Sequence, residues 1–225
     1  MNKNPVQNKA LRASRIGIFA ALYAVTSLVP ISVFIGAPSF LALNLIITPA
    51  MAILLSPSEA LFAALFGGVV SFYVASMQAM FGPYTILLPV AGATFGSLTY
   101  HKTKRGASIS ALFLAGAISA YLIKNYPFPY FIMPHFVAIV LALLSSFKRM
   151  TPLRVKIPMY AYVSTMAEQG MMMIFAVHLI GLPWQVFVGI LPLMVYERLI
   201  GTVGATIVII SLMRIIPEYF SERAI

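Results

Sequence analysis

The 225 residues are 61% apolar and only 9% charged, whereas soluble domains average about 45–50% apolar and about 25% charged. This composition excludes a soluble globular domain, a disordered tail and a collagen-like fibre. It predicts an all-α membrane protein, a polytopic helical bundle located in the cell membrane with lipid around it.

Apolar runs divide the chain into about eight segments. A hydrocarbon core of ~30 Å needs roughly 20 apolar residues of helix. The runs lie at about 12–34, 39–56, 58–77, 84–101, 107–124, 128–147, 157–180 and 188–213. Several are close to the minimum length, which leaves six spans as the alternative if one pair lies at the interface. We therefore expect residues 1–225 to form a single integral membrane domain, with a cytoplasmic amino-terminal tail over 1–11.

Basic residues gather in four places beside these runs. They are Lys3, Lys9, Arg12 and Arg15; Lys102, Lys104 and Arg105; Lys148, Arg149, Arg154 and Lys156; and Arg214 and Arg223. Positive charge favours the cytoplasmic side of a membrane, so all four clusters and both termini are predicted to be cytoplasmic. Between successive clusters lie four, two and two runs, and each number is even, as a shared side requires. Topology thus explains the formal charge of +10 more simply than nucleic acid does, and no nucleic-acid partner is expected.

The helix that begins near residue 57 carries a recognisable start signal. In the sequence Ser56-Pro57-Ser58-Glu59, the serine can cap the helix, the proline suits the first helical position, and Glu59 can reach back in a capping box. Glu59 is therefore predicted to be structural, although it is one of only five acidic residues.

Small residues recur at a spacing of four on several runs, which lets helices approach closely. The stripes are Gly17, Ala20, Ala21 and Ala24; Ala60, Ala63, Ala64, Gly67 and Gly68; Gly92 and Gly96; and Ala111, Ala115, Gly116 and Ala120. Packing within the bundle suffices to explain most of them, and a partner protein's helix is the alternative. The periodicity alone does not choose between the two.

The gaps on the predicted outer side, 30–40, 77–84, 124–131 and 181–189, carry few charges and many aromatic residues. Such residues suit an interfacial aromatic belt, and the sharper interpretation, which does not exclude the belt, is the lining of an outward-facing ligand pocket. Tyr84, Tyr126, Tyr130 and Trp184 are candidates to stack on a flat ring. Candidate polar groups near this side are Asn44 and His135, with Gln78, Asn125, His178 and Gln185 as further possibilities. For His135, a hydrogen-bonded interfacial residue is the simpler interpretation.

Ionisable residues in the last two runs are the most unusual feature. Charged residues at membrane depth are rare, usually paired and often functional. Glu168 lies 15 residues before a predicted turn at Pro183, and Arg198 lies 15 residues after it. Two helices leaving one turn place these positions at similar depth, so a Glu168–Arg198 pair is predicted. Glu197 would then be left for a ligand, a proton or a third partner. A buried ion pair that fixes helix register is the structural alternative.

Several chemical functions lack their motifs. The chain has no phosphate-binding loop, no H-E-x-x-H motif, no cysteine and no aspartate, and its three histidines are far apart. The run Met171-Met172-Met173 is typical of flexible apolar filler more than of soft-metal capture. We therefore expect no enzyme activity, no catalytic residue, no metal and no cofactor.

Three stretches resemble the substrate-binding S components of energy-coupling-factor (ECF) vitamin transporters. They are Arg15 to Ala24 ending in Val29-Pro30, with an A-x-x-x-A carried by Ala20 and Ala24; Asn44 through Glu59 to Gly68; and Leu191-Pro192 to Glu197 followed by a small-residue helix reaching Arg214. The similar parts cover about 12–101 and 157–214, while the runs at 107–147 depart from the family's six-helix pattern.

The resemblance implies a membrane subunit that captures a vitamin or similar small molecule on the outer side. A transmembrane T component and two ATPase subunits would supply the power, with Gly17, Ala20, Ala21 and Ala24 as the docking stripe. The substrate-binding candidates are Glu197, Arg198, Glu168, Asn44, His135, Tyr84, Tyr126, Tyr130 and Trp184. The alternative is a self-sufficient secondary transporter coupled to a proton or ion through Glu168 or Glu197, and a membrane enzyme ranks third.

Overall fold

The computed structural model describes residues 5–33, 40–76, 79–146, 153–217 and 219. Within them the chain forms eight α-helices, which match the eight predicted runs in order. They are α1 (Pro5–Thr26), α2 (Asn44–Leu54), α3 (Pro57–Val74), α4 (Leu87–His101), α5 (Thr103–Asn125), α6 (Met133–Ser145), α7 (Leu153–Phe175) and α8 (Trp184–Ile215). Short 3-10 turns, η2 (Gly82–Ile86) and η3 (Pro129–Ile132), precede α4 and α6, and a π-helical segment, η4 (Ala176–Ile180), extends α7. The prediction of an all-α protein is confirmed.

A small antiparallel hairpin replaces helix between the first two predicted runs. Strand β1 (Pro30–Val33) pairs with β2 (Phe40–Ala42), so the predicted runs 12–34 and 39–56 extend too far at the ends that meet the predicted gap 30–40. Proline disfavours helical geometry at the residue before it, and β-branched side chains such as Ile31 suit an extended chain. Helix α1 consequently ends at Thr26. It also begins at Pro5, inside the predicted tail, where a proline suits the first helical turn.

Four helical stretches within the described residues are long and apolar enough to cross a membrane. They are Pro57–Val74, Lys104–Asn125, Leu153–Ile180 and Trp184–Ile215. Large apolar side chains point outward from them, for example Leu112, Ile123 and Ile207, which are 61–73% exposed. Outward apolar surface of this kind favours a lipid environment, so the chain is a helical membrane-embedded protein. Helix α2 has only 11 residues, about 16 Å at ~1.5 Å per residue, and is too short to cross a bilayer alone.

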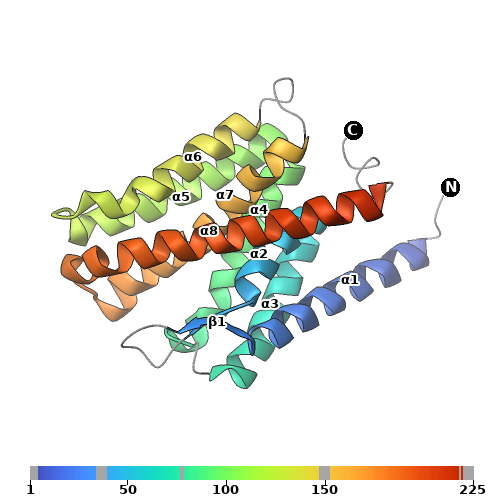
Figure 1. Cartoon of the computed structure of the whole chain (residues 1–225), viewed down its shortest axis with the longest axis horizontal. Helices are drawn as coiled ribbons and strands as arrows, with labels where there is room; N and C mark the ends of the chain where they lie inside the picture. Colours follow the sequence, from blue (N-terminus) through green and yellow to red (C-terminus); the bar gives the residue numbers. More distant parts are fainter. Residues whose placement is uncertain (1–4, 34–39, 77–78, 147–152, 218, 220–225) are drawn as a thin grey trace.

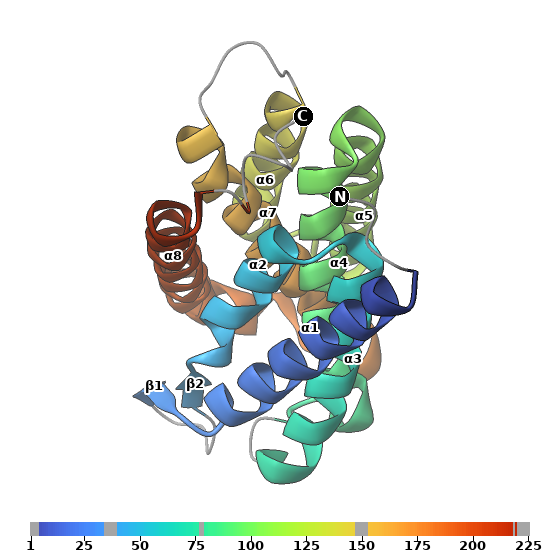
Figure 2. The same cartoon turned by 90° about the vertical axis from the view of Figure 1, so that its right-hand side faces the viewer.

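The helices run back and forth between two ends of the molecule. The start of α1 and the carboxyl end of α8 lie at one end, which we call the basic end (Figure 1). Contacts between α1, the start of α3 and the chain after α8 hold this end together: Arg12 donates to Ser58 Oγ at 3.0 Å, and the Arg15 guanidinium lies 5.9 Å from the Tyr219 ring centroid. The β-hairpin and the end of α3 lie at the opposite end (Figure 2).

The predicted capping box at the start of α3 is confirmed. The Ser56 backbone N–H and hydroxyl both donate to Glu59 Oε2, at 3.0 and 2.7 Å. The other carboxylate oxygen, Oε1, faces Arg12 and Arg15 at 3.6 and 3.8 Å. Glu59 therefore joins α1 to α3 at the basic end, as a structural residue.

Small residues mark the closest helix approaches inside the bundle. A Cβ on Gly92 would lie 2.7 Å from Thr48 Cγ2 of α2 and 3.0 Å from Glu168 Cβ of α7, and one on Gly96 would lie 2.6 Å from Ser164 Cβ. A Cβ on Gly67 would lie 3.0 Å from the Ala20 carbonyl oxygen. Packing within the bundle therefore explains the stripes of α3 and α4.

Candidate functional site

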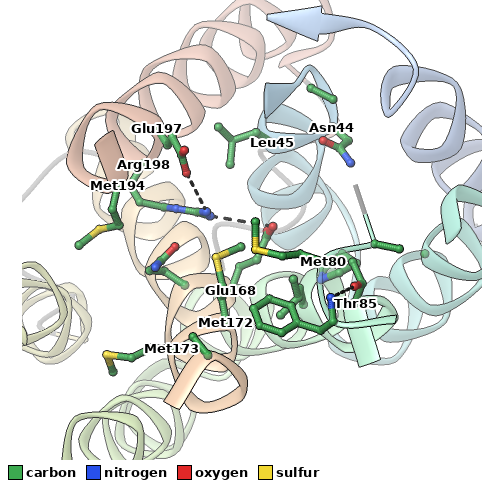
Figure 3. Close-up of a pocket in the computed structure, with 18 of the residues that line it drawn as sticks. Asn44, Leu45, Met80, Thr85, Glu168, Met172, Met173, Met194, Glu197 and Arg198 are labelled. Atoms are coloured by element: carbon green, nitrogen blue, oxygen red, sulfur yellow. Dashed lines mark hydrogen bonds and ion pairs between the residues drawn. The ribbon is translucent and has the colours of Figure 1, made fainter. Parts of the chain in front are cut away.

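A cavity of about 190 Å³ lies between the helices, and parts of the predicted outer gaps line it. Its polar side comes from the middle of α7 and α8 and the start of α2. Its apolar residues come from α3, α4, η3 and the segment before η2, and also from α7 and α8, where Met172, Met173 and Met194 are labelled (Figure 3). The lining includes the polar residues Tyr23, Asn44, Ser71, Thr85, Glu168, Gln169, Glu197 and Arg198, and the large apolar residues Leu45, Phe72, Met80, Phe81, Leu88, Phe131, Met172, Met173, Phe187, Ile190 and Met194.

Three charged side chains meet on one side of the cavity. Arg198 Nη1 lies 3.9 Å from Glu168 Oε1, and Arg198 Nη2 lies 3.5 Å from Glu197 Oε2. The predicted Glu168–Arg198 pair is confirmed. The expectation that Glu197 would be left unpaired is wrong, because the planar guanidinium reaches both carboxylates (Figure 3). One positive and two negative groups give this trio a formal charge of −1.

The trio is buried and only partly satisfied. Arg198, Glu197 and Glu168 are 2%, 5% and 8% exposed. Within the described part of the chain, Glu168 Oε2, the neighbouring Gln169 Oε1 and Arg198 Nε have no hydrogen-bond partner. Buried polar groups are nearly always hydrogen-bonded, and each one left open costs roughly 1–3 kcal/mol. Two acceptors and one donor beside a cavity are thus available to a bound molecule.

The turn between α7 and α8 sets the depth of these residues. Gly181 has a positive φ of 77° after the π-helical segment, and α8 begins at Trp184. This agrees with the predicted turn near Pro183 and places Glu168 and Arg198 side by side. At Gly201, a Cβ would lie 3.0 Å from Leu45 and 3.2 Å from Thr165 Cγ2. The missing side chain lets α8 lie close to α2 and α7.

The structure brings together four of the predicted substrate-binding residues: Asn44, Glu168, Glu197 and Arg198 all line the cavity. His135 is fully buried, with its ring centroid 6.2 Å from that of Phe131, and it is not in the cavity lining. Its ring therefore packs inside the bundle. Gln78 lies outside the described residues.

The predicted outer aromatics divide into two sets. Tyr84, Tyr126 and Tyr130 are 50–73% exposed and, like the half-buried Trp184, do not line the cavity. Three buried rings, Phe81, Phe131 and Phe187, do line it. The polar hydroxyl of tyrosine suits a membrane interface, whereas phenylalanine has no polar atom to satisfy. These outer residues therefore include both belt-like and pocket-lining members.

Sequence reasoning missed the methionines of the cavity. Met172 and Met173 follow Glu168 and Gln169 by four residues, and Met194 precedes Arg198 by four. Residues four apart share one face of a helix, so this spacing was the signal that could have found them. The interpretation of Met172 and Met173 as apolar filler overlooked that they line the cavity.

The predicted docking stripe is split between two faces of α1. Ala20 and Ala24 are 9% and 5% exposed, and the Ala20 carbonyl packs near Gly67 of α3. Gly17 and Ala21 are exposed, and a Cβ on Gly17 would meet no atom within 4 Å. Only this second face is open to another molecule.

No protein-family model, curated protein or solved structure matches the chain.

Proposed function

We propose that the chain is the membrane-embedded substrate-capture subunit of an ECF-type importer for a vitamin or similar small molecule. The observation that carries the proposal is the cavity, which combines unpartnered buried polar atoms with apolar walls. Ligand sites use such walls for affinity and a few polar groups for orientation. In this proposal the basic end faces the cytoplasm, both termini are cytoplasmic, and the cavity fills from outside the cell membrane.

A transmembrane T component and two ATPase subunits would complete the importer. The exposed face of α1, with Gly17 and Ala21, is the docking surface in this proposal, because Ala20 and Ala24 are buried within the subunit. Small exposed residues let a partner helix approach closely.

A second candidate is a self-sufficient secondary transporter coupled to a proton or ion. The buried trio of Glu168, Glu197 and Arg198 favours it, because ionisable residues inside membranes often carry protons or ions. Two buried carboxylates beside one arginine would supply a site for the coupling ion.

Purified protein separates these candidates. Native mass spectrometry of the detergent-solubilised chain would detect a co-purified small molecule, which then serves as the labelled ligand for vesicle experiments. A capture subunit binds this ligand tightly and does not accumulate it in vesicles without its ATPase partners. Uptake by the chain alone, driven by an ion gradient, would overturn the capture proposal and favour the secondary transporter.

A further inference from the structure

The charges around the cavity do not balance. Glu168 and Glu197 share a single arginine, Arg198, and all three residues are at most 8% exposed. A buried charge without a counter-charge is costly, because removing one partner of a buried pair leaves the other charge uncompensated. With both carboxylates ionised, the trio is one positive charge short of neutrality.

The described residues around the cavity offer no second cation to fill this place. Among the described residues that line the cavity, Arg198 is the only basic one. Lys124, the one basic residue of the predicted outer gaps, is exposed and is not in the lining. The neighbouring stretches 34–39 and 77–78 contain no charged residue in the sequence. The described lining therefore supplies no second cation, and a bound molecule is the candidate source of this positive charge.

The open hydrogen-bonding atoms indicate the form of the cation. Glu168 Oε2 and Gln169 Oε1 are buried acceptors on adjacent residues of α7, and no described group donates to either. Two acceptors on one side of the cavity suit a head group that carries N–H donors, such as an ammonium. Hydrogen bonds of this charge-assisted kind are about twice as strong as neutral ones.

The rest of the cavity favours an organic body over a bare metal ion. Metal cations such as Ca²⁺ take six or more oxygen ligands, and no group of three His, Cys, Asp or Glu residues suited to a metal ion occurs in the part of the chain that the structure describes. The apolar part of the lining includes Met80, Phe81 and Met172. The volume of about 190 Å³ compares with the engineered cavity of about 150 Å³ that binds benzene.

We infer that the cavity binds a small organic monocation, about the size of a substituted single ring, with its N–H-bearing head at Glu168 and Gln169 and its apolar body against the methionine and phenylalanine walls. The inference rests on the proposed capture function and names its class of substrate. The Glu168–Arg198–Glu197 trio supplies the negative charge, and Arg198 Nε remains as a donor for an acceptor atom on the ligand.

Three size-matched probes test the charge preference. Benzylammonium, benzyl alcohol and benzoate are titrated into the full chain in detergent, with binding followed by calorimetry and thermal unfolding. Benzylammonium is expected to bind at least tenfold more tightly than benzyl alcohol, and benzoate is expected to bind most weakly. Sodium and potassium chloride serve as the inorganic arm. Stabilisation by these salts without stabilisation by benzylammonium would overturn the inference.

Two site variants and one control assign the preference to the cavity. Glu197→Gln brings the trio to a formal charge of zero, so the preference for benzylammonium over benzyl alcohol should fall at least tenfold. Gln169→Met keeps the charge and removes one open acceptor, so benzylammonium binding should weaken even if Glu197→Gln fails to fold. Glu59→Gln makes the same charge change at another carboxylate and should leave the preference unaltered. An unchanged preference in both site variants would overturn the inference.

Failure of the ligand class and failure of the capture function give different results. The inference that the ligand is a cation would be overturned by any of four results, each of which leaves the capture function standing. They are equal affinity for the three probes, preference for benzoate, absence of benzylammonium binding, and a co-purified molecule that is neutral or anionic. Cation-selective binding together with gradient-driven uptake by the lone chain would uphold the class and overturn the capture function.

Discussion

Removing the arginine of the buried trio should destabilise the protein strongly. In Arg198→Met, Glu168 and Glu197 lose their shared partner at 3.9 and 3.5 Å. At an effective dielectric constant of about 20, each contact corresponds to roughly 4 kcal/mol of Coulomb attraction, and desolvation of the three ions offsets part of it. Measured losses for breaking a buried pair are about 3–5 kcal/mol. For a chain of this size that corresponds to a fall in Tm of roughly 6–20 °C.

The assay is thermal unfolding of the purified protein in one detergent, followed by tryptophan fluorescence or circular dichroism. The triple variant Glu168→Gln, Glu197→Gln and Arg198→Met removes all three charges and should regain most of the lost stability, because no carboxylate then remains buried without a counter-charge. Lys124→Met, which removes an exposed cation, controls for the change in net charge. If Arg198→Met unfolds within 2 °C of the unaltered protein, as a rough threshold, the argument that this arginine offsets buried negative charge is wrong.

Three further predictions concern the packing of the bundle. Gly92→Ala should lower the free energy of unfolding by about 1–3 kcal/mol and weaken ligand binding, since its Cβ would lie 2.7 Å from Thr48 and 3.0 Å from Glu168. Gly116→Ala is the control, because a Cβ there would meet no atom within 4 Å, and equal Tm values for the two variants would contradict the packing argument. Glu59→Ala should lower stability by about 1 kcal/mol through loss of the capping box, measured by thermal unfolding; an unaltered Tm would count against it. Ala21→Trp should abolish co-purification with a T component and leave the fold intact, because Ala21 is exposed, whereas Ala20→Trp should lower Tm, because Ala20 is buried. The reverse pattern would refute the assignment of the exposed and buried faces of α1.

Much of the helical framework follows from local features of the sequence. Apolar runs gave the number and order of the helices because each run is longer than a turn and bounded by charges or prolines. The hairpin between α1 and α2 escaped this reasoning, since Ile31 and its neighbours are as apolar as helix residues. An apolar run reports burial or lipid contact, and it does not distinguish extended from helical backbone.

The sequence predicted only those contacts of the site for which the number of residues between two positions sets their separation in the fold. Equal spacing from the turn placed Glu168 beside Arg198, and the 3.9 Å contact agrees. Whether Arg198 also reached Glu197 depended on the side-chain direction, which spacing does not give. Burial of His135 and the contribution of Phe81 depend on contacts between distant helices. No sequence pattern of a single helix contains that information.

Two buried glutamates of this chain differ in a way that separates structural from functional charge. Glu59 is 3% exposed, and both its oxygens are engaged, Oε2 by Ser56 and Oε1 by two arginines. Glu168 is 8% exposed, yet its Oε2 has no partner in the described structure and it shares its arginine with Glu197. If the trio served stability alone, apolar residues of similar size would serve as well or better. A carboxylate left open beside a cavity costs stability in the empty protein, and that cost is recovered when a bound molecule supplies the missing donor and charge. Glu59 is not among the residues that line the cavity, and its two engaged oxygens leave no open acceptor for a ligand.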